Sequence, residues 1–297
     1  MNAQIKSGAA IRTESLFVAI GPQNYRIERP WAKIPPDATV GAISAVAADS
    51  RGYVYVYHRV DPLVEGVASH PVLVFDSAGT YVTGWGGGLI KDAHHLFVDP
   101  QDRVFLVDRD AHQIRVFETG GKHLFDIGER DKPLRPFNHP TSVATGPSGD
   151  IYVADGYGGT NVHRFASDGT HIHTWGEPGS GPGQFTTPHG IWVLGDGRVL
   201  VGDRENHRIQ VFDPAGAYLC ELGGTYLPMS IYVDKAGIIY VTDHIPRLTA
   251  YRVDGSRVGS CRPVLNGGHG ICGDQAGNLF ISEMNPNRVT RMSPVLS

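Results

Sequence analysis

The sequence predicts an all-β protein folded as a single six-bladed β-propeller, and three observations carry this prediction. A stretch of short strands and tight turns recurs six times along the chain. The repeats follow one another at intervals of 40 to 50 residues, the period expected of propeller blades with four strands each. The 297 residues include 38 Gly and 20 Pro, which suits many short strands joined by turns. The whole chain, 1–297, is therefore expected to form one domain.

The clearest repeat lies at 189–213 and holds three strands. HGIWVL at 189–194 is followed by a tight turn at 195–197, then by RVLVGD at 198–203 and RIQVFD at 208–213. β-Branched and aromatic residues are frequent in these segments, and Gly, Asp and Pro bound them. This pattern predicts an antiparallel meander, and one such meander needs neighbours of the same kind to bury both of its faces.

Two columns emerge when the six repeats are aligned on the turn between their first and second strands. The turn residues are Gly52, Asp102, Gly149, Gly197, Gly237 and Gly277. Six positions later, at the end of the second strand, lie His58, Asp108, Asp155, Asp203, Asp243 and Glu283. Five of the six residues in this second column are acidic, so we call it the acidic column.

The first and last segments of the chain are expected to meet. The last repeat stops soon after NRVTRM at 287–292, so the sixth blade lacks its outermost strand. The N-terminal segment 15–31 has alternating apolar residues, including Tyr25 and Trp31. We expect part of it to supply the missing strand and close the ring, which removes sheet edges that invite aggregation. Residues 1–40 are then an N-terminal arm with a closing strand, and the alternative is a loose arm.

Charge and composition exclude several classes of function. Lys and Arg number 26 against 30 Asp and Glu, and no basic run stands out, so a nucleic-acid partner is not expected. No run of 18 apolar residues could span a bilayer, and the first residues lack the apolar segment of a signal peptide. We therefore expect a cytoplasmic protein without a membrane partner. The three cysteines, Cys220, Cys261 and Cys272, have no disulfide or zinc spacing.

A third column contains the candidate metal ligands. Eight positions before the turn, the six repeats carry Ser44, His94, Thr141, His189, Met229 and His269. The three histidines fall in every second repeat, and equivalent positions in a propeller are related by rotation about its axis. Three imidazoles about 120° apart would therefore point inward at one height. This arrangement predicts three protein ligands with an open position, as in a catalytic zinc site.

The position after the acidic column carries Arg59, Arg109 and Arg204 in three repeats, and Tyr157 lies one place further in the third. Such arginines are usually solvated turn residues, but beside a metal-bearing channel guanidinium groups suit a substrate carboxylate. A Tyr near a metal ion and Arg can act as a base, because both positive charges favour the phenolate. Other histidines are interpreted as turn or surface residues, among them His58, His95, His139 and His244.

Three longer insertions separate strands of the early repeats, at 59–71, 129–140 and 173–188. In repeat folds, insertions collect on one face of the molecule, and that face is often the binding face. We therefore expect these three segments to surround the mouth of the channel and to contact a small-molecule substrate.

Motifs within the repeats carry a family resemblance. Asn206-His207-Arg208-Ile209 resembles the NHL repeat, whose families form six-bladed propellers. DGY at 155–157, PHG at 188–190 and DREN at 203–206 follow one another in order. With these motifs the sequence resembles peptidyl-α-hydroxyglycine α-amidating lyase, a zinc-dependent six-bladed propeller that completes peptide amidation. The likeness covers most of the chain, from about residue 44 to residue 292.

The resemblance implies roles for individual residues. The zinc-binding histidines of the lyase fall on the three histidines of the column, His94, His189 and His269. Its catalytic tyrosine falls on Tyr157, and its two active-site arginines fall on Arg59 and Arg204. The implied reaction is the cleavage of a carbinolamide, or a similar α-hydroxy compound, to a carbonyl product and an amide. Zinc binds the substrate hydroxyl, Tyr157 takes its proton, and the two arginines hold a substrate carboxylate and stabilise the phenolate.

The sequence also departs from the lyases. Their disulfide partners near the third repeat correspond here to Asn138 and Gly158, which suits a reducing compartment. Their acidic residue linked to structural calcium corresponds to Gly270, so calcium is doubtful. No copper monooxygenase domain precedes the lyase-like part, and the expected partner is a separate oxygenase that supplies the hydroxylated substrate.

Two other functions stay open from the sequence. A zinc hydrolase or hydratase of a small ester, lactone or amide would use the same three histidines. A non-catalytic NHL propeller that binds a protein or RNA would use the loop faces without chemistry, because a fold does not fix a function.

Overall fold

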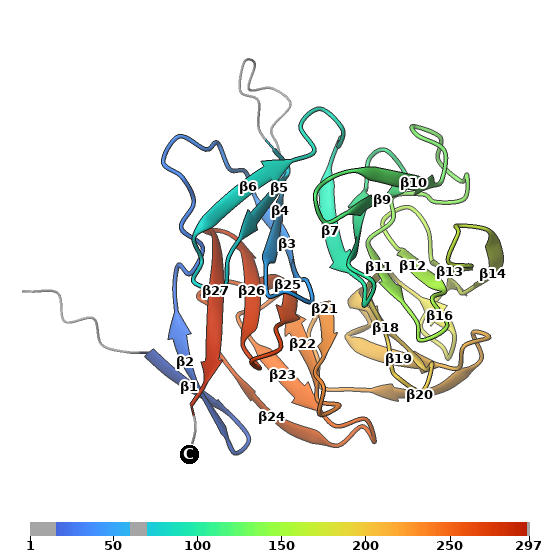
Figure 1. The fold of residues 1–297 in the computed structure, drawn as a ribbon. Helices are drawn as coiled ribbons and strands as arrows, with labels where there is room; N and C mark the ends of the chain where they lie inside the picture. Colours follow the sequence, from blue (N-terminus) through green and yellow to red (C-terminus); the bar gives the residue numbers. More distant parts are fainter. Residues whose placement is uncertain (1–15, 60–69, 296–297) are drawn as a thin grey trace, which may run out of the picture.

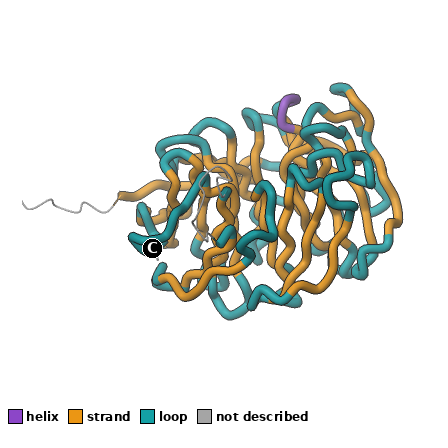
Figure 2. The backbone as a smooth tube through the Cα atoms, turned by 90° about the horizontal axis from the view of Figure 1, so that it is seen from above, coloured by secondary structure: helices purple, strands orange, loops and turns teal. Residues whose placement is uncertain are grey.

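The computed structural model describes residues 16–59 and 70–295. These residues form six antiparallel sheets around a central axis, so the predicted all-β six-bladed propeller is confirmed (Figure 1). Strands and loops make up nearly all of the described chain, and its helical element is one short 3-10 turn, η1 at Arg204–Asn206 (Figure 2). No helix in the two described ranges is long and apolar enough to cross a membrane.

The first three blades each have four strands in chain order, with the first strand innermost. Blade one comprises β3 Ile43–Ala48, β4 Val54–His58, β5 Val72–Phe75 and β6 Tyr81–Trp85. Blade two comprises β7 Ala93–Val98, β8 Arg103–Asp108, β9 Gln113–Glu118 and β10 His123–Ile127. Blade three comprises β11 Ser142–Thr145, β12 Ile151–Asp155, β13 Asn161–Phe165 and β14 His171–Trp175.

The next two blades repeat this order after a small parallel pair, β15 Glu177–Pro178 and β16 Gln184–Phe185. Blade four comprises β17 Pro188–Val193, β18 Val199–Asp203, β19 Arg208–Phe212 and β20 Tyr218–Leu222. Blade five comprises β21 Pro228–Val233, β22 Ile239–Asp243, β23 Leu248–Tyr251 and β24 Arg257–Cys261. The first strands of successive blades contact one another all the way round the ring.

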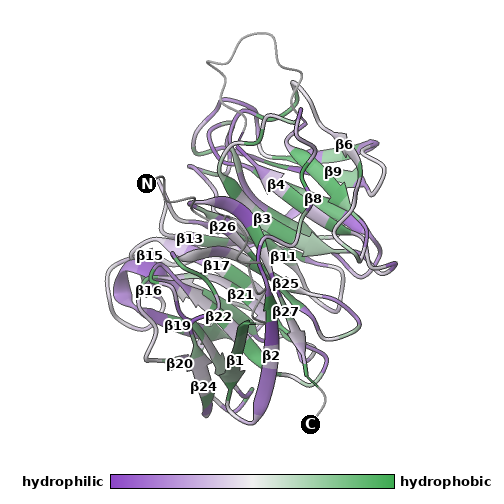
Figure 3. Cartoon of the chain, turned by 90° about the vertical axis from the view of Figure 1, so that its left-hand side faces the viewer, coloured by the Kyte–Doolittle hydropathy of each residue, from purple (hydrophilic) through white to green (hydrophobic). Residues whose placement is uncertain are grey.

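The sixth blade is built from both ends of the chain. It comprises β25 Gly268–Gly273, β26 Leu279–Met284, β27 Asn287–Pro294, β2 Gln23–Glu28 and β1 Leu16–Ile20. β2 pairs antiparallel with β27, from Tyr25 opposite Pro294 to Glu28 opposite Arg291 (Figure 3). The predicted closing strand is therefore confirmed, while β1 is a fifth strand that the repeat pattern did not predict.

Aromatic side chains fasten this closure to the neighbouring blade. Trp31 follows β2 and is buried, and its ring centroid lies 4.7 Å from that of Phe280 in blade six and 6.2 Å from that of Phe75 in blade one. The backbone N–H of Trp31 donates to the carbonyl of Val289. The N-terminal segment thus packs between the last and first blades, and the apolar area that it buries there stabilises the closed ring.

The acidic column has a structural role that recurs around the ring. Each carboxylate is buried at the end of a second strand and accepts a backbone N–H from the loop that enters its own blade. The bonds join Asp108 to Lys91 and Asp92, Asp155 to Asn138, Asp203 to Thr186, Asp243 to Tyr226 and Glu283 to Leu265. These loops lead to the inner strands, so the acidic column fixes the backbone on one face of the propeller.

His58 takes the place of the carboxylate in blade one, and its prediction as a turn or surface residue was wrong. Its side chain is fully buried, its Nδ1 accepts the N–H of Gly41 at 3.3 Å, and its Nε2 donates to the carbonyl of His70 at 2.9 Å. An imidazole can accept a backbone N–H as a carboxylate does, and it can do so without a charge. Burial lowers the pKa of His58, because desolvation penalises the imidazolium.

We expect the stability of the protein to fall in mild acid because of His58. A histidine whose pKa is lowered by folding binds fewer protons in the folded state, so its stabilising effect is complete above the unfolded pKa of about 6.5. As the pH falls below that value, the free energy of unfolding falls too. In His58→Gln, whose amide accepts and donates without titrating, urea unfolding between pH 7 and pH 5 will show a shallower loss. Equal slopes in the two proteins would contradict this role.

Candidate metal centre

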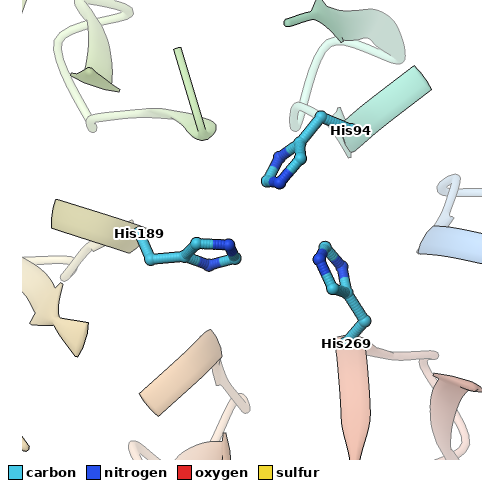
Figure 4. A group of neighbouring side chains, drawn as sticks. All are labelled: His94, His189 and His269. Carbon is cyan, nitrogen blue, oxygen red and sulfur yellow. The ribbon is translucent and has the colours of Figure 1, made fainter. Parts of the chain in front are cut away.

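Three inner strands bring the predicted histidines together on the axis. His94 in β7, His189 in β17 and His269 in β25 come from blades two, four and six, and their ring centroids lie 5.1 to 5.4 Å apart. One ligand nitrogen from each lies within 4.8 Å of the others (Figure 4). We call these three residues the histidine triad. Residues separated by 80 to 175 positions thus meet because the column repeats around a closed ring.

Each imidazole of the triad is held by the blade that follows it. The Nδ1 atoms of His94, His189 and His269 donate to backbone carbonyl groups, each at 2.7 Å. The three acceptors are Thr141, Met229 and Ser44, which are the other members of the same column. Because Nδ1 carries the hydrogen, Nε2 carries the lone pair and faces the centre. This is the outer-shell arrangement that orients metal-binding histidines in proteins.

The electrostatics of the triad favour neutral imidazoles. Burial and the neighbouring rings lower the pKa of His94 and His189 well below the ordinary value, and burial lowers that of His269 to about 4. Arg59 and Arg204 act in the same direction on His269. All three residues are therefore unprotonated at neutral pH, the state in which an imidazole binds a metal ion.

The triad fits a divalent transition metal by its donors. In a tetrahedral site with zinc–nitrogen bonds of roughly 2.0–2.1 Å, the nitrogens lie about 3.4 Å apart. The Nε2 atoms therefore need only a small inward movement to bind one ion. Three imidazoles suit zinc, and they also suit iron, copper and nickel. The donor set thus supports a metal site.

Tyr157 lies directly above the triad. Its hydroxyl oxygen is 3.2 Å from Nε2 of His94 and 3.2 Å from Nε2 of His189, and Nη1 of Arg204 donates to it at 3.2 Å. A Cβ at Gly156 would lie 2.0 Å from the carbonyl oxygen of Pro188, so only glycine lets this loop approach blade four so closely. The Tyr157 side chain is 39% exposed, which leaves it within reach of a substrate that enters from solvent.

The three arginines also gather around Tyr157 and the triad. The guanidinium of Arg204 lies 5.2 Å from the centroid of the Tyr157 ring, and that of Arg109 lies 5.4 Å from it. Arg59 and Arg109 share Asp92, with Nε to carboxylate distances of 3.2 and 2.8 Å. Arg109 was not predicted as a site residue. It occupies the same column as Arg59 and Arg204, and this shared position could have identified it.

Each arginine already has a carboxylate neighbour at the mouth. Arg204 pairs with Glu205 at 2.9 Å, and Asp92 bridges Arg59 and Arg109. Burial raises the pKa of Asp92, and the two arginines oppose this shift. A substrate carboxylate would therefore compete with Asp92 and Glu205 for the guanidinium groups, and the exposed pair with Glu205 is the easier one to exchange.

Two of the three predicted loops lie at this end of the channel. The segment 129–140 reaches the Tyr157 loop, where the carbonyl of His139 accepts the N–H of Tyr157 at 3.3 Å. The segment 173–188 leads into β17 and His189, and the carbonyl of Thr187 accepts the N–H of Arg204. Most of the third segment, at 60–69, lies outside the described residues.

Asn138 and Gly158, which correspond to the disulfide positions of the lyases, are in contact. The N–H of Gly158 donates to the carbonyl of Asn138 at 2.9 Å, and Nδ2 of Asn138 donates to the carbonyl of Gly158 at 2.8 Å. A Cβ built on Gly158 would lie 2.6 Å from Cγ of Asn138. Two hydrogen bonds thus hold the Tyr157 loop where a covalent bond is expected in the lyases.

We expect the double variant Asn138→Cys, Gly158→Cys to form a disulfide on air oxidation. Closing a loop of about 20 residues should stabilise the protein by about 3 kcal/mol and raise its Tm. The thiol titration should then find the three native cysteines alone, because both new thiols are consumed. The single variant Asn138→Cys is the control. A double variant that keeps both new thiols free would show that the loops do not approach as described.

Gly270, next to His269, has no room for a side chain. A Cβ there would lie 2.9 Å from Oγ of Ser282 and 3.0 Å from Cα of Ala45. An acidic side chain at residue 270 would therefore require the backbone of blade one to move. The packing around residue 270 therefore suits the glycine found in this sequence.

His95 lies in the channel below the triad, and its prediction as a turn or surface residue was also wrong. The register of β7 shifts between Ala93 and His95, so consecutive residues His94 and His95 both approach the channel. His95 lines a small cavity with Phe97 and Trp192, and burial lowers its pKa to about 3. Simple alternation along a strand cannot anticipate a bulge. His139 and His244 do lie in loops, as predicted.

Fold and site together define a six-bladed propeller with a histidine-lined central channel. The NHL repeat model matches residues 137–165 and 185–212. The chain is similar to peptidyl-α-hydroxyglycine α-amidating lyase 1 of Drosophila melanogaster, at 28% identity over 86% of this chain and 52% of that protein. Peptidyl-glycine α-amidating monooxygenase B of Xenopus laevis is 25% identical over 86% of this chain and 34% of that protein.

Another relative has no enzymatic name. The human NHL repeat-containing protein 3 is 31% identical over 64% of this chain and 56% of that protein. The chain thus spans from about a third to just over half of these three relatives. Among solved structures, a streptogramin B lyase covers 94% of this chain with a TM-score of 0.66 at 13% identity, and the whole of that chain is covered.

A gluconolactonase from Xanthomonas campestris has a TM-score of 0.69 at 14% identity, with 96% of this chain and 99% of that chain covered. At such identities both structures show the propeller fold alone. The similarity to the amidating lyases, by contrast, is a similarity of sequence over 86% of this chain.

Proposed function

We propose that this chain is a metal-dependent lyase that cleaves a carbinolamide to a carbonyl product and an amide. The observation that carries the proposal is the position of the Tyr157 hydroxyl, 3.2 Å from two Nε2 atoms of the triad and 3.2 Å from an arginine nitrogen. A proton acceptor, three neutral metal donors and a cationic group therefore surround one point. The similarity to amidating lyases supports the same assignment.

The reaction can be divided among the residues of this site. A divalent cation held by the triad, zinc in our proposal, supplies a Lewis acid that makes a substrate hydroxyl more acidic. The phenolic oxygen of Tyr157 takes the hydroxyl proton, and Arg204 stabilises the charge on that oxygen with its hydrogen bond. Arg59 and Arg204 hold the substrate carboxylate, and Arg109 packs on the Tyr157 ring.

The bond changes then balance within the site. The hydroxyl oxygen becomes the carbonyl oxygen of the product as the carbon–nitrogen bond breaks. The amide nitrogen leaves with the bonding electron pair and receives the proton that Tyr157 accepted. No water oxygen enters either product in this step. The substrate is an α-hydroxylated amide, so we also propose that a separate oxygenase supplies it.

The test uses N-benzoyl-α-hydroxyglycine, which carries both a carbinolamide and a carboxylate. Zinc-loaded protein should release glyoxylate and benzamide faster than buffer does, and removal of the metal should abolish the difference. In ¹⁸O-labelled water the benzamide should contain no label, whereas a hydrolase would release labelled benzoate. Absence of glyoxylate above the buffer rate would refute the proposal.

A further inference from the structure

Asp155 differs from the other carboxylates of the acidic column in its side-chain partner. Each of the other four pairs with an arginine, namely Asp108 with Arg130, Asp203 with Arg208, Asp243 with Arg247 and Glu283 with Arg288. Opposite Asp155 on β13 the chain has Asn161, whose amide donates to the carbonyl of Gly176 instead. Within the described ranges no Lys or Arg pairs with Asp155, which is 2% exposed. This buried carboxylate therefore needs another donor.

His163, also on β13, is the side chain that faces this carboxylate. Its Nε2 lies 3.6 Å from Oδ2 of Asp155, and the residue is 5% exposed. Neither Nε2 of His163 nor Oδ1 of Asp155 has a hydrogen-bond partner, and both atoms are buried. A buried donor and a buried acceptor that stay unpaired are costly, so a small movement that joins them is favourable.

The position of His163 on its strand supplies a donor in two other blades. His163, Gln210 and Thr290 occupy the same position on the third strands of blades three, four and six. Nε2 of Gln210 donates to Asp203 at 3.2 Å, and the hydroxyl of Thr290 donates to Glu283 at 2.7 Å. In blade three the residue at this position is an imidazole, which can donate in the same way.

Asp155 also holds the loop on which Tyr157 lies. It comes two residues before Tyr157, and its Oδ2 accepts the N–H of Asn138 at 2.7 Å. Asn138 in turn exchanges two hydrogen bonds with Gly158, directly after Tyr157. The place of the phenolic oxygen over the triad therefore depends on the orientation of the Asp155 carboxylate.

We propose that His163 is a positioning residue, which donates its Nε2 hydrogen to Asp155 and thereby holds the loop that carries Tyr157. The hydroxyl of Thr174 lies 2.9 Å from Nδ1 of His163 and donates to it, so the neutral ring carries its hydrogen on Nε2. The ring of Phe137 packs edge to face with that of His163, at 5.3 Å between centroids, and keeps it beside Asp155. The effect on catalysis rests on the proposed function, in which the Tyr157 oxygen takes the substrate proton.

Replacing His163 by Leu or by Gln tests this role. Leu removes the donor, whereas Gln supplies an amide as Gln210 does in blade four, so Gln should restore what Leu loses. In His163→Leu the N–H groups of Tyr157 and Gly158 should exchange with deuterium about tenfold faster, with exchange in blade five unchanged. In His163→Gln they should exchange within about twofold of the unchanged protein. Only the Leu variant should lose kcat toward N-benzoyl-α-hydroxyglycine, by about 10- to 100-fold at unchanged metal content, because a small misplacement of a catalytic group is that costly.

His173→Leu is the matched control, since His173 is exposed on the neighbouring strand β14 and should change neither exchange nor kcat. A second measurement needs no stable Leu variant. In the unchanged protein at neutral pH, the ¹⁵N signal of Nε2 of His163, assigned by its loss in His163→Gln, should be that of a nitrogen that carries hydrogen. An Nε2 without hydrogen would overturn the inference.

Hydrogen exchange separates this inference from the proposed function, because it needs no substrate. Unchanged exchange at Tyr157 and Gly158 in His163→Leu would refute the positioning role, even if the unchanged protein is a lyase. Faster exchange in that variant, restored by Gln, in a protein that cleaves no α-hydroxy amide would sustain the role of His163 and refute the lyase.

Discussion

Replacing Tyr157 by Phe should lower kcat toward N-benzoyl-α-hydroxyglycine by about 10² to 10⁴-fold while the metal content stays unchanged. The phenolic oxygen is the group proposed to take the substrate proton, and positioned general bases contribute accelerations of this order. The substitution removes one oxygen atom and its hydrogen bond from Arg204, and it keeps the ring that the guanidinium groups of Arg109 and Arg204 contact. KM should change much less than kcat.

The matched control for this variant is Tyr226→Phe. Tyr226 is 46% exposed and stacks on His207. Its hydroxyl has no proposed role, so the control should retain full activity and metal. A Tyr157→Phe protein as active as the unchanged protein would remove the tyrosine from the reaction. Loss of the metal in that variant would instead assign the hydroxyl a role in holding the ion.

Replacing His189 by Ala should weaken metal binding by more than about 100-fold and reduce lyase activity to the buffer rate. Loss of an outer-shell partner alone costs 10 to 100-fold in affinity, and the loss of a direct ligand costs more. Elemental analysis after dialysis against a low concentration of zinc measures the effect. The unchanged protein should retain about one ion per chain, held by three imidazoles.

His171→Ala is the control for the metal site. His171 is exposed on β14 and its Nε2 bonds only to the hydroxyl of Thr174, so the variant should bind metal normally. A His189→Ala protein that keeps one tightly bound ion would show that the metal lies elsewhere. Less than about 0.2 metal per chain in the unchanged protein, even with zinc added, would favour a non-catalytic propeller that binds a macromolecule.

Much of the candidate site could be predicted because residues at one position of the repeat lie around the same axis of the propeller. A single offset from the turn residue selected His94, His189 and His269, and the closed symmetry placed them around one axis. The same offset holds the three acceptors of their Nδ1 hydrogen bonds, although nothing in the residue types of Ser44, Thr141 and Met229 indicates a backbone contact. Side-chain patterns predict where side chains meet, and they carry little information on main-chain acceptors.

The features that were not predicted all break the repeat. His95 enters the channel through a bulge, and His58 replaces a carboxylate in a buried position. β1 extends the sixth sheet although no other blade has a fifth strand in the described chain. A cavity beside His269 is lined by Ile245, which lies in the loop after β22, and by Met284 at the end of β26. Ile245 and Met284 come together only once blades five and six have formed.

The hydrogen bond between His269 and Ser44 joins residues 225 positions apart, across the joint where the chain closes on itself. His94 and His189 are anchored in the same way to blades three and five, so every blade contributes either an imidazole or its anchor. A nascent chain that lacks blade six has two imidazoles and no complete donor set. If the proposed function holds, the complete donor set for the metal ion forms only after all six blades have assembled.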